Sequence, residues 1–201
     1  GSQLVIDRTS ILFCLLGLAL LVAGCGGDQG DASDRATETA PPTGGSNALQ
    51  PLRSGRDVLA PDGRFSLRVP GEWVRYDDPF AELAFRTVAE DPAIALNVVR
   101  EELAENPRPQ VYAEDARRRI SSSYSNVVSL SLSPVKIGAL EAYRWVYTAT
   151  AGGQDRLFYQ LFVVDDGQGF VLTGVAPIGA DFNVTRSLFD SIAGTLTFAR
   201  G

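Results

Sequence analysis

The chain has 201 residues, 45% of them hydrophobic and 21% charged, which is ordinary for one globular domain with polar segments attached. A net charge of −6 disfavours nucleic acid as a partner. The sequence contains no histidine, and Cys14 and Cys25 are its only cysteines, which excludes catalytic triads built on a histidine base. We therefore expect a protein that is not an enzyme and carries no cofactor and no metal.

The first element along the chain is a continuous apolar run at residues 11–23. It is shorter than the roughly 20 residues that span a bilayer, and its length is that of a signal-peptide core. The sequence Leu-Val-Ala-Gly-Cys at residues 21–25 follows, with small residues before the cysteine. This resembles the lipobox of bacterial lipoproteins, in which the thiol is acylated and the peptide is cut before it. The resemblance implies a signal peptide over residues 1–24 and a lipid such as palmitate on Cys25.

Residues 26–56 are rich in Gly, Asp, Ser, Thr and Pro. Because such a segment is too polar to bury against a core, we predict a flexible tether over residues 25–56, with an r.m.s. reach of roughly 30 Å. A loop packed on the domain remains an alternative only for the last few residues before Asp57. The globular domain is then expected over residues 57–201, at the extracytoplasmic face of the cell membrane.

The domain opens with Phe65, Leu67 and Val69 alternating with polar residues, which predicts a half-buried strand. Three more strands are expected at residues 73–76, 82–88 and 93–100. An apolar residue at every fourth position then predicts a helix over residues 109–124. Its expected buried stripe consists of Tyr112, Ala116, Ile120 and Tyr124.

Alternation resumes after this helix, where Val128, Leu130 and Leu132 are separated by serines. Further strands are expected at residues 141–149, 156–164 and 170–176, then a second helix at 181–193 and a short strand through Leu196 and Phe198. Two separated helices among hairpin-connected strands indicate an α+β fold with a mostly antiparallel sheet flanked by two helices.

Two stretches resemble the PsbP-like superfamily, which includes extrinsic subunits of photosystem II and lipoproteins of the DcrB and LpqN types. The first is Phe-Ser-Leu-Arg-Val-Pro-Gly-Glu-Trp at residues 65–73. The second comprises residues 170–177, Phe182, 188–192 and 195–198. The resemblance implies a PsbP-like sandwich and a binding or assembly role rather than catalysis. Where photosystem subunits carry histidine-containing metal sites, this chain has no histidine.

The residues Tyr143, Trp145 and Tyr147 share one face of a predicted strand, and they could form a surface for a partner. The alternative is that these three side chains are buried beneath a helix, because one face of the sheet must be buried in a domain of this size. Arg117 opens a run of three arginines, which suggests an anionic partner such as lipid head groups or an acidic protein face. On a helix, three consecutive residues spread over some 200°, so at most two of the arginines share one side. The alternative to a binding role is that the arginines are solvated at the end of the helix.

The function expected from these features is a membrane-anchored, non-enzymatic binding module for a membrane or envelope protein. A small-molecule or lipid carrier is the alternative, and it requires an apolar cavity lined partly by Tyr143, Trp145 or Phe162. A hydrolase is a third hypothesis. It would use Lys136 with a serine, or two of the carboxylate pairs at residues 77–78, 90–91, 101–102 and 165–166, converging in one cleft.

Overall fold

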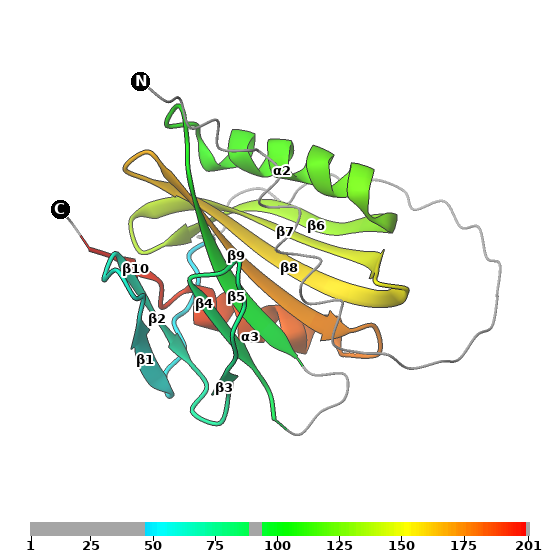
Figure 1. Cartoon of the computed structure of the whole chain (residues 1–201), viewed down its shortest axis with the longest axis horizontal. Helices are drawn as coiled ribbons and strands as arrows, with labels where there is room; N and C mark the ends of the chain where they lie inside the picture. The colour runs from blue at the N-terminus through cyan, green and yellow to red at the C-terminus, as the bar shows by residue number, and fades with distance from the viewer. Residues whose placement is uncertain (1–46, 89–93, 200–201) are drawn as a thin grey trace.

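Two antiparallel β-sheets and two helices form the fold in the computed structural model, which describes residues 47–88 and 94–199 (Figure 1). The expected signal peptide and residues 25–46 of the expected tether, which include Cys25, lie outside the described residues. Among the helices that are described, none is both long and apolar enough to cross a membrane.

The larger sheet has seven strands in the order β3-β4-β5-β9-β8-β7-β6, each antiparallel to its neighbours. Its strands are β3 (Val74–Arg75), β4 (Leu83–Arg86), β5 (Ala95–Glu102), β6 (Ser125–Ile137), β7 (Leu140–Ala151), β8 (Gln154–Asp165) and β9 (Gln168–Pro177). Tight turns connect β7 to β8 through Gly152 and Gly153, and β8 to β9 through Asp166 and Gly167, all four with positive φ. The β7–β8 and β8–β9 pairings run without interruption along these long strands.

A second sheet of three strands has the order β1-β2-β10. It consists of β1 (Arg56–Leu59), β2 (Phe65–Val69) and β10 (Thr197–Phe198). The alternation expected at β2 is confirmed, since Phe65, Leu67 and Val69 are buried. The division into two sheets was not predictable from the sequence, because a local pattern identifies a strand but does not determine its partner strand.

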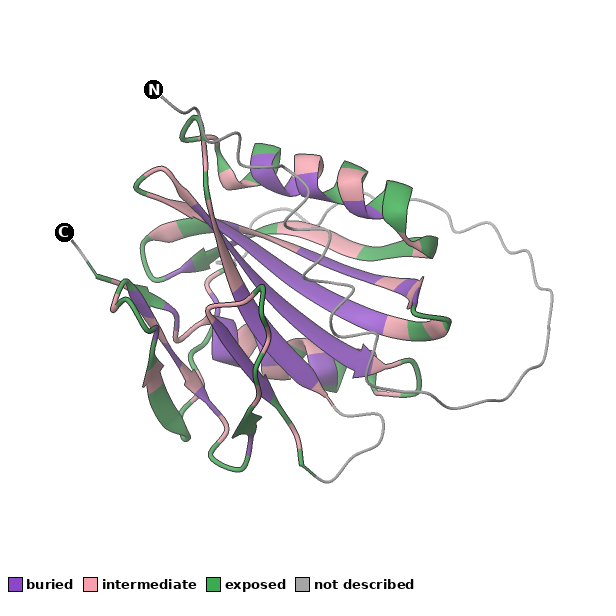
Figure 2. Cartoon of the chain, viewed as in Figure 1, coloured by how far each residue is buried: buried purple, intermediate pink, exposed green. Residues whose placement is uncertain are grey.

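The helices α2 (Pro109–Ser123) and α3 (Phe182–Ala193) cover opposite faces of the larger sheet (Figures 1 and 2). One core cluster joins that sheet to α3 and to the small sheet, and a second cluster lies beneath α2. The expected α2 stripe is confirmed at Tyr112, Ala116 and Ile120, with Ala113 added. At the start of α3, the Asp181 carboxylate accepts hydrogen bonds from the backbone N–H groups of Asn183 and Val184, at 2.8 and 3.0 Å.

Strand β6 lies at the edge of the larger sheet and differs from expectation. Val128 and Leu130 are exposed, whereas Leu132 is partly buried. Two register shifts against β7, at residues 125–128 and 129–131, explain the difference. Such irregularities rotate successive side chains, so strict alternation does not predict which of them face the core.

The packed part of the chain begins at least ten residues before Asp57, where we expected the domain to start. Residues 47–52, here called the strap, lie along β6 and α3. Leu49 belongs to the core, and the Leu52 N–H donates to the Ser191 carbonyl at 2.8 Å. A Cβ on Gly194 would lie 3.0 Å from the Gln50 backbone, so the strap packs tightly against the end of α3.

Candidate functional site

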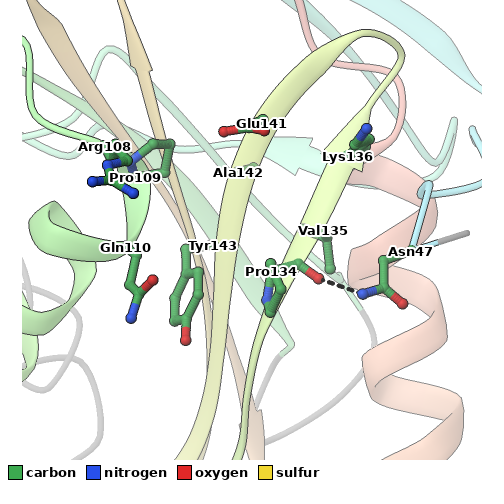
Figure 3. A pocket seen from close by; sticks show the side chains of 10 residues that line it. All are labelled: Asn47, Arg108, Pro109, Gln110, Pro134, Val135, Lys136, Glu141, Ala142 and Tyr143. Atoms are coloured by element: carbon green, nitrogen blue, oxygen red, sulfur yellow. Dashed lines mark hydrogen bonds between the residues drawn. The ribbon is translucent and has the colours of Figure 1, made fainter. Parts of the chain in front are cut away.

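A cleft of about 430 Å³ lies where the β6–β7 hairpin extends past the first turn of α2 (Figure 3). Tyr143 and Pro134 are directly opposite each other in the β6–β7 ladder, and Lys136 is opposite Glu141. Because side chains alternate along a strand, all four lie on the sheet face that α2 covers further along. The helix begins only at Pro109, so this end of the face stays open. The lining residues are Asn47, Arg108, Pro109, Gln110, Pro134, Val135, Lys136, Glu141, Ala142 and Tyr143.

The start of α2 forms one wall of this cleft. Arg108 occupies the N-cap position and Pro109 begins the helix, where its fixed φ suits the first turn. The Gln110 side-chain amide donates to the Glu114 carboxylate at 2.9 Å, which holds both residues along the helix. Figure 3 shows the Gln110 side chain running beside the Tyr143 ring.

The strap forms the opposite wall. The Asn47 side-chain amide donates to the Pro134 carbonyl at 3.0 Å, and the Lys136 N–H donates to the Asn47 carbonyl at 3.0 Å. The Leu49 N–H in turn donates to the Lys136 carbonyl at 2.8 Å, so the strap pairs with the free edge of β6 in a short parallel bridge. The chain therefore enters the domain at the cleft.

Of the residues proposed from sequence as a partner surface, Tyr143 lines this cleft and Arg117 is not part of its lining. Burial raises the pKa of the Tyr143 hydroxyl, the nearby Glu114 carboxylate raises it further, and the Arg117 guanidinium acts in the opposite direction. Tyr143 thus lines the cleft and has the exposed Arg117 nearby on the helix. The Tyr143 side chain is partly buried and also packs against the core beneath α2.

Trp145 and Tyr147 are not part of any surface, which corrects the expected three-residue face. Their exposures are 1% and 0%, and they stack at 3.8 Å between ring centroids beneath α2. The Trp145 indole N–H donates to the Ser129 hydroxyl at 3.0 Å, so the one polar atom of this ring has a partner. Phe162 is buried in the same cluster. Within the described residues, Trp145 and Phe162 are therefore packed in the core rather than lining an apolar cavity, whereas Tyr143 borders the cleft.

Strand geometry excludes Ser133 as the partner of Lys136 in the Ser–Lys pair considered for a hydrolase. Ser133 and Lys136 are three residues apart on β6 and project to opposite faces. The Ser133 hydroxyl accepts from the Arg144 guanidinium at 3.1 Å, on the α3 side of the sheet. No lysine other than Lys136 occurs in the sequence.

The carboxylate pairs do not assemble into one acidic centre among the described residues, and residues 90–91 lie outside them. The Asp78 carboxylate accepts hydrogen bonds from the Phe80 N–H at 3.0 Å and from the Asn97 side-chain amide at 3.1 Å, so it stabilises a turn. Glu101 and Glu102 line a polar cavity of about 410 Å³, in which Arg100 pairs with Asp62 and Glu82. In the described ranges, no group of three His, Cys, Asp or Glu side chains is placed to hold a metal ion.

A polar cluster that sequence reasoning missed joins β7, β8 and α3. The Arg144 guanidinium pairs with the Asp190 carboxylate at 2.6 Å, and the Tyr159 hydroxyl donates to the same carboxylate at 2.8 Å. Burial and then the Asp190 charge hold the pKa of Tyr159 well above its usual value. Because the three residues are 15 to 46 positions apart along the chain, no local motif marks them.

Comparison with known proteins identifies the fold. No protein-family model matches the chain, and none of the curated proteins is similar to it in sequence. Cyanobacterial PsbP (CyanoP) from Synechocystis sp. PCC 6803 is similar in structure, with a TM-score of 0.55 and 13% identity over 72% of this chain and 92% of that one. LpqN of Mycobacterium tuberculosis, which is involved in cell envelope biogenesis, gives a TM-score of 0.56 and 16% identity over 72% and 90% of the two chains.

The yeast Ran-binding protein Mog1p from Saccharomyces cerevisiae is also similar, with a TM-score of 0.52 and 10% identity over 72% of this chain and 95% of that one. The chain therefore has the PsbP-like α+β fold, which confirms at the level of fold the resemblance carried by residues 65–73 and 170–198. Identities of 10 to 16% show the fold alone.

Proposed function

We propose that this protein is a membrane-anchored, extracytoplasmic lipoprotein whose PsbP-like domain binds a membrane or envelope protein without catalysing a reaction. The lipid is carried by Cys25, and residues 26–46 link it to the domain. The contact site is the cleft between the start of α2, the β6–β7 hairpin and the strap.

One observation carries this proposal: Asn47 of the strap, the part of the domain nearest in sequence to Cys25, forms a wall of the cleft. Cys25 precedes it by 22 positions, a length of chain that extends to at most about 75 Å. An anchor at Cys25 would therefore keep the domain within this distance of the membrane, with the cleft on the side of the domain that the tether joins. Such confinement raises the effective concentration of partners embedded there.

The fold supports a binding role, because LpqN is described as an envelope biogenesis protein and Mog1p as a Ran-binding protein. The carrier alternative has less support from the described residues. Trp145 and Phe162 are packed in the core, and the cleft that Tyr143 lines has a charged rim formed by Arg108, Lys136 and Glu141. An enclosed apolar cavity would be needed to shield a lipid chain from water.

The experiment that tests the proposal is site-specific photo-cross-linking in intact membranes. A photoreactive amino acid at Gln110, on the wall of the cleft, is expected to capture one dominant membrane protein, which mass spectrometry identifies. The same probe at Val184, an exposed position on α3, provides the matched control and is expected to capture little.

A Cys25→Ser variant completes the design. We expect it to lose both metabolic labelling with palmitate and the cross-link from Gln110. Labelling that persists in the variant would contradict lipidation at Cys25. Equal capture from Gln110 and Val184 would contradict the cleft as the contact site.

A further inference from the structure

We propose that the cleft holds a singly charged phosphodiester group, of the kind found in an anionic phospholipid head group, between Arg108 and Lys136. This inference rests on the proposed function, because it names a ligand of the same site. It starts from the two cations on the rim and from the organic surface between them (Figure 3).

The two cations are free to bind a ligand. Within the described part of the chain, neither the Arg108 guanidinium nor the Lys136 ammonium takes part in an ion pair or a side-chain hydrogen bond. By contrast, Arg68, Arg100, Arg118, Arg119 and Arg144 each pair with a carboxylate. Unpaired cations on both rims of a cleft favour an anion that bridges them.

Glu141 lowers the net positive charge of the cleft. It lies opposite Lys136 in the β6–β7 ladder, and among the described residues it forms an ion pair with neither cation. With two positive charges and one negative, the lining has a net charge of one. This lining attracts an anion, and the preference for a diester over inorganic phosphate depends on the organic surface of the cleft.

The remaining lining suits the organic groups that a diester carries on both sides of its phosphate. Pro109, Pro134 and the Tyr143 ring provide apolar contact surface, and the Gln110 and Asn47 amides are hydrogen-bonding groups. The strap, which is the part of the domain nearest in sequence to Cys25, forms one wall of the cleft. A head group at the membrane surface is therefore within reach of the site.

Binding can be measured by native mass spectrometry of the full chain in a non-ionic detergent. The probes are dihexanoyl phosphatidylglycerol, glycerophosphoglycerol and inorganic phosphate. We expect one molecule of phosphatidylglycerol per chain and at least about tenfold weaker binding by the Arg108→Gln/Lys136→Gln variant, which corresponds to about 1.4 kcal/mol. The Arg53→Gln/Arg75→Gln variant changes the net charge equally at exposed positions elsewhere, and it is expected to bind like the unmodified chain.

The outcomes distinguish recognition of the phosphodiester head group alone from recognition that also requires the lipid chains. Binding of both diesters would assign recognition to the head group itself, and binding of phosphatidylglycerol alone would add a requirement for the lipid chains. Inorganic phosphate binding as tightly as the diesters, or an unchanged affinity in the Arg108→Gln/Lys136→Gln variant, would overturn the proposal. The cross-link from Gln110 reports the protein contact separately, so it can persist when diester binding fails.

Discussion

At the scale of single residues, two glycines in β9 set how closely the helices approach the sheet. A Cβ on Gly174 would lie 2.5 Å from the Phe189 ring of α3, and a Cβ on Gly169 would lie 2.7 Å from the Tyr112 ring of α2. Neither position has a positive φ, so close approach is the reason for glycine at both. The aromatic rings of the two helices thus contact the backbone of the same strand from opposite faces.

Gly174→Ala is expected to destabilise the domain by about 1–3 kcal/mol, because a methyl group must displace a fully buried ring. Chemical denaturation measures the change in the free energy of unfolding. Gly179→Ala is the matched control, since nothing lies within 4 Å of a Cβ there. Equal stability of the two variants would show that Phe189 moves aside without cost.

The Arg144–Asp190–Tyr159 cluster is also a residue-scale feature, and its ion pair is largely buried, with side-chain exposures of 14% and 19%. Asp190→Asn is expected to cost about 3 kcal/mol, because it leaves the Arg144 charge without its carboxylate partner. Tyr159→Phe removes only one neutral donor and is expected to cost about 1 kcal/mol. Denaturation curves that rank the two variants in the reverse order would contradict this account.

At the scale of elements, α2 is held to the sheet by its apolar stripe and by polar contacts at the edge of β5. Arg119 pairs with Asp115 on its own helix at 2.7 Å and lies 4.0 Å from the Glu101 carboxylate of β5. Burial raises the pKa of Glu101, and a hydrogen bond from Tyr112 and the Arg119 charge only partly offset this effect. Ionisation of Glu101 is therefore less favourable in the folded chain than in the unfolded chain.

The expected consequence is a pH-dependent stability that Glu101→Gln removes. Because the folded chain binds the Glu101 proton more tightly than the unfolded chain, this residue's contribution to stability falls as pH rises from 4.5 through the folded pKa. At neutral pH the Glu101→Gln variant should be more stable than the unmodified chain, and below pH 4.5 the two should agree. Thermal unfolding at a series of pH values tests this, and a difference that grows at low pH would contradict it.

Helices and strands were predictable where the apolar period is regular. The stripe of Tyr112, Ala116 and Ile120 identified α2, because a helix repeats every 3.6 residues whatever its tertiary partners. The irregular edge strand β6 was not predictable in the same way, since its register shifts depend on pairing with β7. The burial of Trp145 and Tyr147 likewise depends on where α2 lies, which no local pattern contains.

At the scale of the whole molecule, the candidate site arises from a mismatch in length between elements. The β6–β7 hairpin extends past the start of α2, and the strap closes the remaining side. Arg108, Lys136 and Asn47 come from three separate segments, so their convergence could not be read from spacing. Tyr143 was predicted as a surface residue from an aromatic face that is visible in sequence, and it lines the cleft, whereas Arg117 does not. The composition of residues 26–56 concealed the strap, because Leu49 and Leu52 are isolated apolar residues in a polar stretch.

The strap leads to a prediction about where the folded unit begins. A chain of residues 47–201 is expected to be more stable than a chain of residues 57–201 by about 3 kcal/mol, because the shorter chain loses the burial of Leu49 and Leu52. Denaturation of the two purified chains measures the difference, and Leu49→Ala in the longer chain should reproduce part of it. If both chains unfold at the same denaturant concentration, the strap adds nothing to the fold. Its hydrogen bonds to Lys136 and Ser191 would then serve only to direct the tether to the cleft.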